Sequence, residues 1–194
     1  MYKEEDLVRI AKRENNTKRK YLVVNRLQGK HIPVSPKNAF EMFDALAELV
    51  KEAYSGEQLL LVGFAETATA IGAALAVKLD TYYMQTTREE IGGVNYLFFS
   101  ETHSHATEQK LIRTDLDLVI DQMDRIIFVE DEVTTGNTIL NIIDIIEKLL
   151  KIIYPGYYRD RAYKSYHANH HLSTLIEDVL YRLSRQIAKV SKFC

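Results

Sequence analysis

The chain has 194 residues, 46% of them hydrophobic and 27% charged, and its formal net charge is -2. This length supports one domain with a substantial core, and the near-neutral charge argues against a nucleic-acid polymer bound through charge alone. The single cysteine excludes a disulfide framework and a cysteine-based zinc site. We find neither a secretory signal nor an apolar run that would span a membrane, so we expect a cytoplasmic protein.

Short apolar runs alternate along the chain with segments of helical periodicity. The run Gln58–Phe64 is typical of a parallel strand covered on both faces, and Ser35 followed by Pro36 is a typical helix start. In chain order the predicted elements are a short helix or solvated arm within 1–20, a strand at Tyr21–Asn25, a helix from Ser35 to Gly56, a strand at Gln58–Phe64, a helix at Ala65–Lys78, strands at Tyr82–Thr86 and Asn95–Ser100, a surface loop at Ser100–Thr114, a strand at Arg125–Val129, a helix at Thr138–Ile153 and a helix of about 20 residues in the C-terminal part.

The alternation of strands and helices predicts an α/β fold with a mainly parallel, Rossmann-like sheet flanked by helices. The connections between the parallel strands are expected to be right-handed crossovers. In such sheets ligands bind at the carboxyl ends of the strands. Residues that directly follow a predicted strand are therefore the first candidates for chemistry.

The segment Glu130–Thr138, which follows the strand Arg125–Val129, carries most of the chemistry that the residues themselves indicate. Two adjacent acids are followed by a turn rich in threonine and glycine and then by a helix start. A helix N-terminus attracts phosphate, threonine hydroxyls add donors, and Gly136 lets the backbone curl around a phosphate oxygen. Glu130 and Asp131 can accept hydrogen bonds from two neighbouring hydroxyls or attract Mg²⁺. Vicinal hydroxyls beside a phosphate indicate a ribose 5-phosphate.

The simpler interpretation of this segment is a threonine that caps the following helix, beside solvated acids. For a single threonine or aspartate we favour that interpretation, but for the whole arrangement after a buried strand we favour a ligand site. The sequence contains no Walker loop, no Gly-x-Gly-x-x-Gly fingerprint and no Gly-x-Ser-x-Gly elbow. A receiver or phosphatase site that uses Asp131 as phosphate acceptor is a weaker alternative, because the acids are contiguous and lack an Asp-x-Asp spacing.

The segment Ile126–Thr138 resembles the phosphoribosyl-diphosphate (PRPP) motif of type I phosphoribosyltransferases, a hydrophobic strand followed by two acids and a Thr/Ser-Gly turn. The first acid of that motif is usually Asp, and here it is Glu130. The resemblance implies the type I phosphoribosyltransferase fold with a small N-terminal hood. It also implies that Glu130 and Asp131 bind the ribose hydroxyls, and that Mg²⁺ is held through the substrate with Asp131 as a candidate ligand. The residues implied for the 5-phosphate are Thr134, Thr135, Gly136, Asn137 and Thr138.

Other segments extend the resemblance over roughly residues 18–150. Leu61–Gly72 is similar to the family's first strand, diphosphate loop and following helix, whereas Asn25–Pro36 and Phe99–Ala106 resemble an orotate-phosphoribosyltransferase-like subgroup found in operons linked to tellurite resistance. The residues implied for the diphosphate loop are Ala65, Glu66, Thr67 and Ala68. The implied organisation is a phosphoribosyltransferase-like domain at 1–155, hood elements within 1–35, and a helical C-terminal extension at 156–194.

Arg88 follows a predicted strand, in the region that supplies basic groups to the diphosphate in the family. A guanidinium suits phosphate oxygens, but a surface ion pair with Glu89 or Glu90 is an equal alternative. Lys110 and Arg113 could also pair with the substrate's charges, and we favour their solvation on a helix face.

His103 and His105 lie in the long polar loop that the resemblance implies will close over the site. A histidine there could contact the diphosphate or act as an acid, and ordinary solvation is the alternative. The hood is implied to select the base, with Lys30 and His31 as its candidate residues, and the alternative is an ordinary turn around Gly29.

These implications amount to a phosphoribosyltransferase that uses PRPP and Mg²⁺ to ribosylate a nitrogenous base and releases diphosphate. The expected partners are PRPP and a base-like small molecule, with no nucleic-acid polymer and no membrane, and a homodimer is the candidate assembly. The alternative is a non-catalytic regulatory protein that binds PRPP or a nucleotide in the same pocket. That alternative stays open because the sequence departs from the family after Ile153, where further strands are expected.

Overall fold

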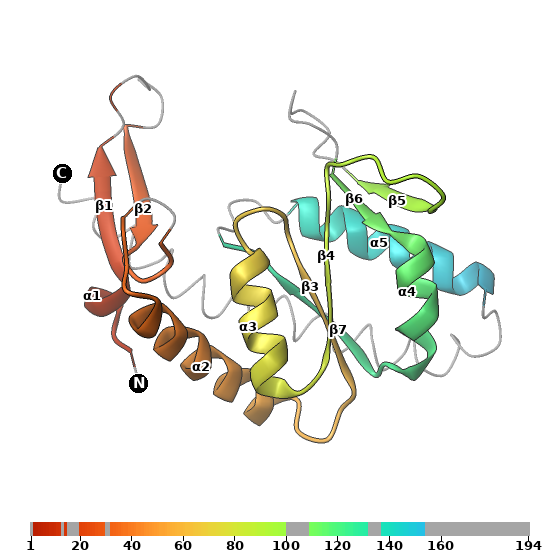
Figure 1. Cartoon of the computed structure of the whole chain (residues 1–194), viewed down its shortest axis with the longest axis horizontal. Helices are drawn as coiled ribbons and strands as arrows, with labels where there is room; N and C mark the ends of the chain where they lie inside the picture. Colours follow the sequence, from red (N-terminus) through yellow and green to blue (C-terminus); the bar gives the residue numbers. More distant parts are fainter. Residues whose placement is uncertain are drawn as a thin grey trace. The chain divides into compact units, whose positions relative to one another are not determined.

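The computed structural model of the chain describes residues 2–12, 14, 20–29, 32–99, 109–131 and 137–153. The chain divides into two units, one made of residues 1–98 and 107–132 and the other of residues 99–106 and 133–194. The elements, labelled in Figure 1, are α1 (Glu4–Leu7), β1 (Val8–Lys12), β2 (Tyr21–Asn25), α2 (Pro36–Ala53), β3 (Leu59–Gly63), α3 (Thr69–Leu79), β4 (Tyr82–Gln85), β5 (Tyr96–Phe99), β6 (Gln109–Ile112), α4 (Arg113–Val119), the 3-10 helix η1 (Ile120–Gln122), β7 (Arg125–Val129) and α5 (Asn137–Ile153).

The centre of the first unit is a parallel three-stranded sheet in the order β4-β3-β7. All five residues of β3 are buried, as its continuous apolar run predicts. The register pairs Gly63, at the end of β3, with Gln85 of β4 and with Val129 of β7. Because β3 is parallel to both neighbours, the carboxyl ends of the three strands meet at one edge of the sheet.

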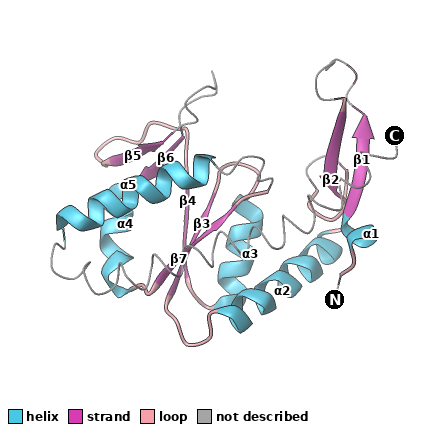
Figure 2. Cartoon of the chain, turned by 180° about the vertical axis from the view of Figure 1, so that it is seen from behind, coloured by secondary structure: helices cyan, strands magenta, loops and turns pink. Residues whose placement is uncertain are grey.

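Two helices of the first unit form a layer next to this sheet (Figure 2). α3 packs against β3 and β4, and α2 packs against α3. α2 begins after Ser35 with Pro36 in its first turn, as predicted, although the Ser35 side chain makes no capping hydrogen bond. The buried residues of α2 recur at helical spacing and are Ala39, Phe43, Ala47 and Val50.

The predicted α/β architecture, with a parallel sheet flanked by helices, is confirmed.

Within residues 1–20 the structure has the short helix α1, as predicted, and then β1, which forms a β-hairpin with β2 and which the prediction missed. β1 and β2 pair antiparallel, from Val8↔Asn25 to Lys12↔Tyr21. The basic residues of this segment, Lys12 among them, suggested a solvated face, and a two-stranded ribbon also accommodates exposed charges because much of its surface faces water. The hairpin lies within the segment predicted to contain the hood, whose role stays a prediction.

Residues 109–119 correct the prediction of a surface loop at Ser100–Thr114. β6 pairs with β5 in a separate two-stranded sheet, and α4 follows β6 directly. Leu111 and Leu116 have no exposed surface, so both elements contribute to the core. A strand of four residues flanked by polar ones is too short to show a periodicity, which explains why the sequence pattern missed it.

In the second unit, α5 matches the helix predicted at Thr138–Ile153. It buries Ile142 and Ile146, which are one helical turn apart. The helix predicted in the C-terminal part, and with it most of the extension at 156–194, lies outside the described residues.

At the amino end of β7, Arg125 ties this strand to the residues that precede β3. Its Nε and Nη2 lie 2.5 and 2.9 Å from the two carboxylate oxygens of Glu57, and its guanidinium lies 4.4 Å from the centre of the Tyr54 ring. The hydrogen bonds to Glu57 raise the pKa of Arg125 above its ordinary value. This paired fork is geometrically specific and fixes the register of β7 against β3 at the end of the sheet away from the strands' carboxyl ends.

The ring of Tyr83 fills a slot between β3 and α3 that two glycines leave open. A Cβ added to Gly63 would lie 2.6 Å from the Tyr83 hydroxyl, and one added to Gly72 would lie 2.6 Å from the ring atom Cε2. The phenol donates a hydrogen bond of 3.1 Å to the carbonyl of Thr69, and burial raises the pKa of Tyr83. The glycines are therefore required by the close approach of β4 to its neighbours.

We predict that Gly72→Ala destabilises the chain by about 1–3 kcal/mol, because the new methyl group overlaps the Tyr83 ring. An alanine inside a helix would otherwise be stabilising by about 0.5–1 kcal/mol relative to glycine. Urea denaturation followed by circular dichroism measures the difference. Gly92→Ala is the matched control, since a Cβ at Gly92 meets nothing within 4 Å. An unchanged midpoint for Gly72→Ala would contradict the role of the slot.

Candidate functional site

Three segments emerge together at the carboxyl edge of the parallel sheet. They are Ala65–Ala68 after β3, Thr86–Arg88 after β4, and Glu130–Asp131 after β7. The strand pairing continues into them, since the Phe64 amide donates to the Val129 carbonyl at 3.0 Å and the Thr86 amide to the Gly63 carbonyl at 2.9 Å. Residues that the sequence places far apart are thus neighbours at the edge where ligands bind in α/β sheets.

The predicted diphosphate loop and the predicted ribose acids are in direct contact. The Thr67 hydroxyl donates a hydrogen bond to Asp131 Oδ1 at 2.5 Å, across 64 residues of sequence. Glu130 folds back so that its Oε1 accepts a hydrogen bond of 3.1 Å from the Asp131 amide. Both carboxylates are half-buried, and Thr67 is exposed. Hydroxyl-bearing ligands at this edge would therefore meet carboxylates whose positions are already restricted.

The loop Ala65–Ala68 offers fewer free backbone donors than its length suggests. The Ala65 amide donates to Thr86 Oγ1 at 2.8 Å, and the Ala68 amide donates to the Phe64 carbonyl at 3.1 Å. Among the described residues, the amides of Glu66 and Thr67 have no such partner. The peptide bond between Ala65 and Glu66 is cis. Of the four backbone amides in the predicted diphosphate loop, only the two central ones lack a hydrogen-bond partner in the described part of the chain.

Thr86 is a structural member of this site that the sequence analysis did not identify. Its side chain is fully buried, accepts the Ala65 hydrogen bond, and donates to Gln109 Oε1 at 3.0 Å. One hydroxyl therefore joins the segment after β3, the end of β4 and the start of β6. The signal that could have found it is its place at the carboxyl end of the predicted strand Tyr82–Thr86, where polar residues follow apolar ones.

Arg88 is exposed at the edge of the sheet, and no carboxylate in the described part of the chain forms an ion pair with it. The alternative of a surface ion pair between Arg88 and Glu89 or Glu90 is not seen among the described residues, where Glu90 pairs with Lys110 instead. The solvated position predicted for Lys110 is wrong, since this residue lies on β6 and only 4% of its surface is exposed. Arg113 begins α4 and pairs with Asp117 at 3.3 Å.

Several predicted site residues cannot be placed in this arrangement. Asn137 and Thr138 begin α5 in the second unit. The predicted residues outside the described ranges are Lys30, His31, His103, His105, Thr134, Thr135 and Gly136. Their roles stay predictions.

The residues present fit a magnesium ion held mainly by a substrate. Mg²⁺ keeps most of its coordination for water and phosphate oxygens and takes one or two carboxylates from the protein. Glu130 and Asp131 supply such carboxylates at the strand edge, and no group of three His, Cys, Asp or Glu side chains suited to a metal occurs among the described residues. This donor set is suited to a metal–substrate complex.

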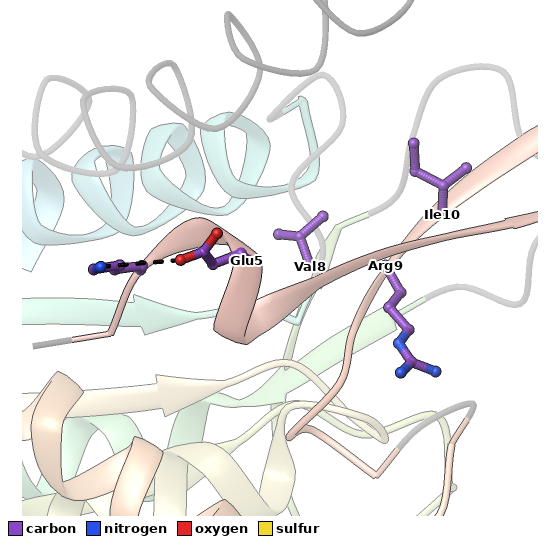
Figure 3. Close-up of a pocket in the computed structure, with 5 residues that line it drawn as sticks. Glu5, Val8, Arg9 and Ile10 are labelled. Carbon is purple, nitrogen blue, oxygen red and sulfur yellow. Dashed lines mark ion pairs between the residues drawn. The ribbon is translucent and has the colours of Figure 1, made fainter.

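A separate hollow beside α1 and β1 does not include these residues. Its lining includes Val8 and Ile10 and the charged residues Glu5 and Arg9 (Figure 3). Lys3, which also lines it, pairs with Glu5 at 4.0 Å, and both side chains are 78% exposed. Such exposed pairs contribute little energy, so this pair does not mark the hollow as a ligand site.

A family of proteins described as phosphoribosyl transferases has a sequence model that matches residues 7–153. The chain belongs to this family. The prediction of a phosphoribosyltransferase enzyme is confirmed at this level, and the matched residues lie within the domain predicted at 1–155. No match was found among functionally curated proteins.

Solved adenine phosphoribosyltransferases share the fold of this transferase. The Rhodothermus marinus enzyme matches with a TM-score of 0.51 at 18% identity, over 74% of this chain and 76% of that one. The Leishmania donovani enzyme matches with a TM-score of 0.52 at 13% identity, over 75% of this chain and 60% of that one. The Saccharomyces cerevisiae enzyme was solved with an imino-altritol bisphosphate and adenine. It matches with a TM-score of 0.50 at 13% identity, over 74% of this chain and 77% of that one. At these identities the likeness concerns the fold alone.

None of the helices in the described part of the transferase is long and apolar enough to cross a membrane.

We predict that Thr86→Val destabilises the transferase by about 1–3 kcal/mol, because the isosteric methyl leaves the Ala65 amide and the Gln109 side chain without their partner. Hydrogen exchange of the Ala65 amide should become faster than in the parent chain. Thr86→Ser is the control, since it keeps the hydroxyl and should retain most of the protection. Equal exchange rates in all three proteins would refute the shared hydrogen bond.

Proposed function

We propose that this transferase moves a phosphoribosyl group from PRPP to a ring nitrogen of a base and releases diphosphate. The observation that carries the proposal is the hydrogen bond of 2.5 Å between Thr67 and Asp131. It joins the segment proposed for the diphosphate to the segment proposed for the ribose. A single substrate with both groups needs these two segments side by side at the sheet edge.

The ribose end of the substrate is assigned to the residues after β7. Glu130 and Asp131 would accept hydrogen bonds from the two ribose hydroxyls, for which adjacent carboxylates at a strand end are well suited. The 5-phosphate is assigned to the threonine- and glycine-rich sequence that leads into α5, because a helix start with neighbouring threonine hydroxyls suits a phosphate. The residues proposed for the phosphate are Thr134, Thr135, Gly136, Asn137 and Thr138.

The diphosphate end is assigned to the segments after β3 and β4. The open amides of Glu66 and Thr67 would donate to diphosphate oxygens, and the exposed Arg88 would add a guanidinium fork. Thr86 would act on this end indirectly by holding the Ala65 amide. Preorganised donors of this kind stabilise the charge that builds up on the leaving group as its bond breaks.

In the proposed reaction the bond between ribose C1 and the diphosphate oxygen breaks, and the electron pair leaves with the diphosphate. The sugar then carries oxocarbenium character, as in glycoside chemistry, and the base nitrogen gives its electron pair to C1. The proton displaced from the base goes to a group or water nearby, and His103 and His105 are the proposed acids or bases. Bound Mg²⁺ would supply charge neutralisation at the diphosphate oxygens.

The base is proposed to bind under the hood, with Lys30 and His31 as the contacting residues. Two observations guide its identity. The sequence resembles an orotate-phosphoribosyltransferase-like subgroup, and the structural neighbours are adenine phosphoribosyltransferases. Orotate and adenine are therefore the first bases to test. The assay uses the protein in whichever assembly it is purified, homodimer or monomer.

We expect the purified chain to release diphosphate from PRPP and Mg²⁺ only when an accepting base is present. The measurement is a coupled diphosphate assay across orotate, adenine and other purines and pyrimidines, with product identified by mass spectrometry. Failure to turn over any base would count against transfer. Tight PRPP binding by calorimetry in that case would instead favour the regulatory alternative.

Asp131→Asn is expected to weaken PRPP binding about ten- to a hundredfold, because a hydrogen bond to a charged group contributes about 1.5–3 kcal/mol. Isothermal titration calorimetry in the presence of Mg²⁺ measures the change. Asp121→Asn is the matched control, since Asp121 lies on η1, before the amino end of β7, and is exposed. If both variants bind PRPP as the parent does, the proposed ribose site is wrong.

A further inference from the structure

Lys110 carries a charge into the core of the first unit. Only 4% of the residue is exposed, yet its ammonium binds the carboxylate of Glu90. The ammonium also lies 4.8 Å from the ring centre of Tyr96 and 5.9 Å from that of Phe98. A buried ammonium is costly unless it is paired, so Lys110 constrains where the Glu90 carboxylate can be.

The segment Thr87–Ile91, which contains both Arg88 and Glu90, is fastened at each end. The Thr87 amide donates to the Lys110 carbonyl at 2.8 Å, and the Lys110 amide donates to the Thr87 carbonyl at 3.0 Å. At the other end the Ile91 amide donates to the Tyr96 hydroxyl at 2.6 Å, and that hydroxyl donates to the Ile91 carbonyl at 3.1 Å. The same neighbourhood that buries Lys110 therefore sets the backbone around Arg88.

Glu90 is a potential competitor for the guanidinium of Arg88. It lies two residues further along the chain, and its side chain is 81% exposed, so little besides Lys110 restrains its carboxylate. In the structure Lys110 holds this carboxylate, and Arg88 has no carboxylate partner among the described residues. An arginine that already formed an ion pair would have to break it before binding an anionic ligand.

We propose that Lys110 is a positioning residue for diphosphate binding, which acts by holding Glu90 away from Arg88. This inference rests on the proposed role of Arg88 in binding the leaving diphosphate. Lys110 does not contact the substrate in this arrangement. Its buried charge keeps one acidic neighbour occupied, so that the exposed guanidinium remains available.

The test measures calorimetric affinity for inorganic diphosphate in the presence of Mg²⁺, using the full chain. Lys110→Met is expected to weaken binding about two- to fivefold, the effect of one competing exposed ion pair. Lys110→Arg keeps the positive charge and should bind nearly as the parent chain does. Adding Glu90→Gln to Lys110→Met removes the competitor and should restore the affinity.

Two controls separate this role from general effects. Glu89→Gln, added to Lys110→Met, removes the same charge from the neighbouring exposed residue and should not restore binding. Affinity for ribose 5-phosphate, assigned to other residues, should be unchanged in Lys110→Met. Equal restoration by Glu89→Gln, or equal loss of affinity for both ligands, would overturn the inference.

The failure of the proposed function has a different signature. If Arg88→Gln binds diphosphate as the parent chain does, the role of Arg88 is wrong, and the inference is overturned with it. If Arg88→Gln weakens binding and Lys110→Met does not, the role of Arg88 stands and the inference about Lys110 alone is overturned.

Discussion

The parallel pairing of β3 with a strand on each side is the constraint on which the rest of the structure depends. β3 is buried along its whole length, and its register with β4 and β7 is defined residue by residue. Because both neighbours run in the same direction, three chain segments must leave the sheet at one edge. The chemistry proposed for the family member follows from this geometry, since no single segment could hold both ends of PRPP.

Polar side chains removed from water organise that edge. Thr86 and Lys110 are the buried polar and charged residues in the described core. The Thr86 hydroxyl connects the segment after β3 with β6, and the Lys110 ammonium connects β6 with the segment after β4. A buried polar group must find its partners, which gives it few acceptable positions. The exposed residues proposed to contact substrate, such as Arg88 and Thr67, thus project from backbone whose placement is determined beneath the surface.

Much of the fold and part of the site could be predicted from the sequence. The apolar run of β3 and the start of α2 at Pro36 were clear because a fully buried strand and a proline in the first helical turn both leave strong local patterns. The strands β1 and β6 were missed, since a four- or five-residue strand with charged members shows no clear period. Glu130 and Asp131 were found from a contiguous motif, whereas the partners of Thr86 and Lys110 come from distant segments, and such pairings leave no signal in a single sequence.

The contact between Thr67 and Asp131 also has a consequence for how the protein acquires its site. The two residues are 64 positions apart, and they meet only through the pairing of β3 with β7. The elements α2, β3, α3 and β4 precede β7 in the chain and are synthesised first, and non-local strand pairing forms slowly, so these elements can be arranged before β7 is available. Affinity for the proposed substrate would therefore appear late in folding, and a partly folded chain would lack the complete site.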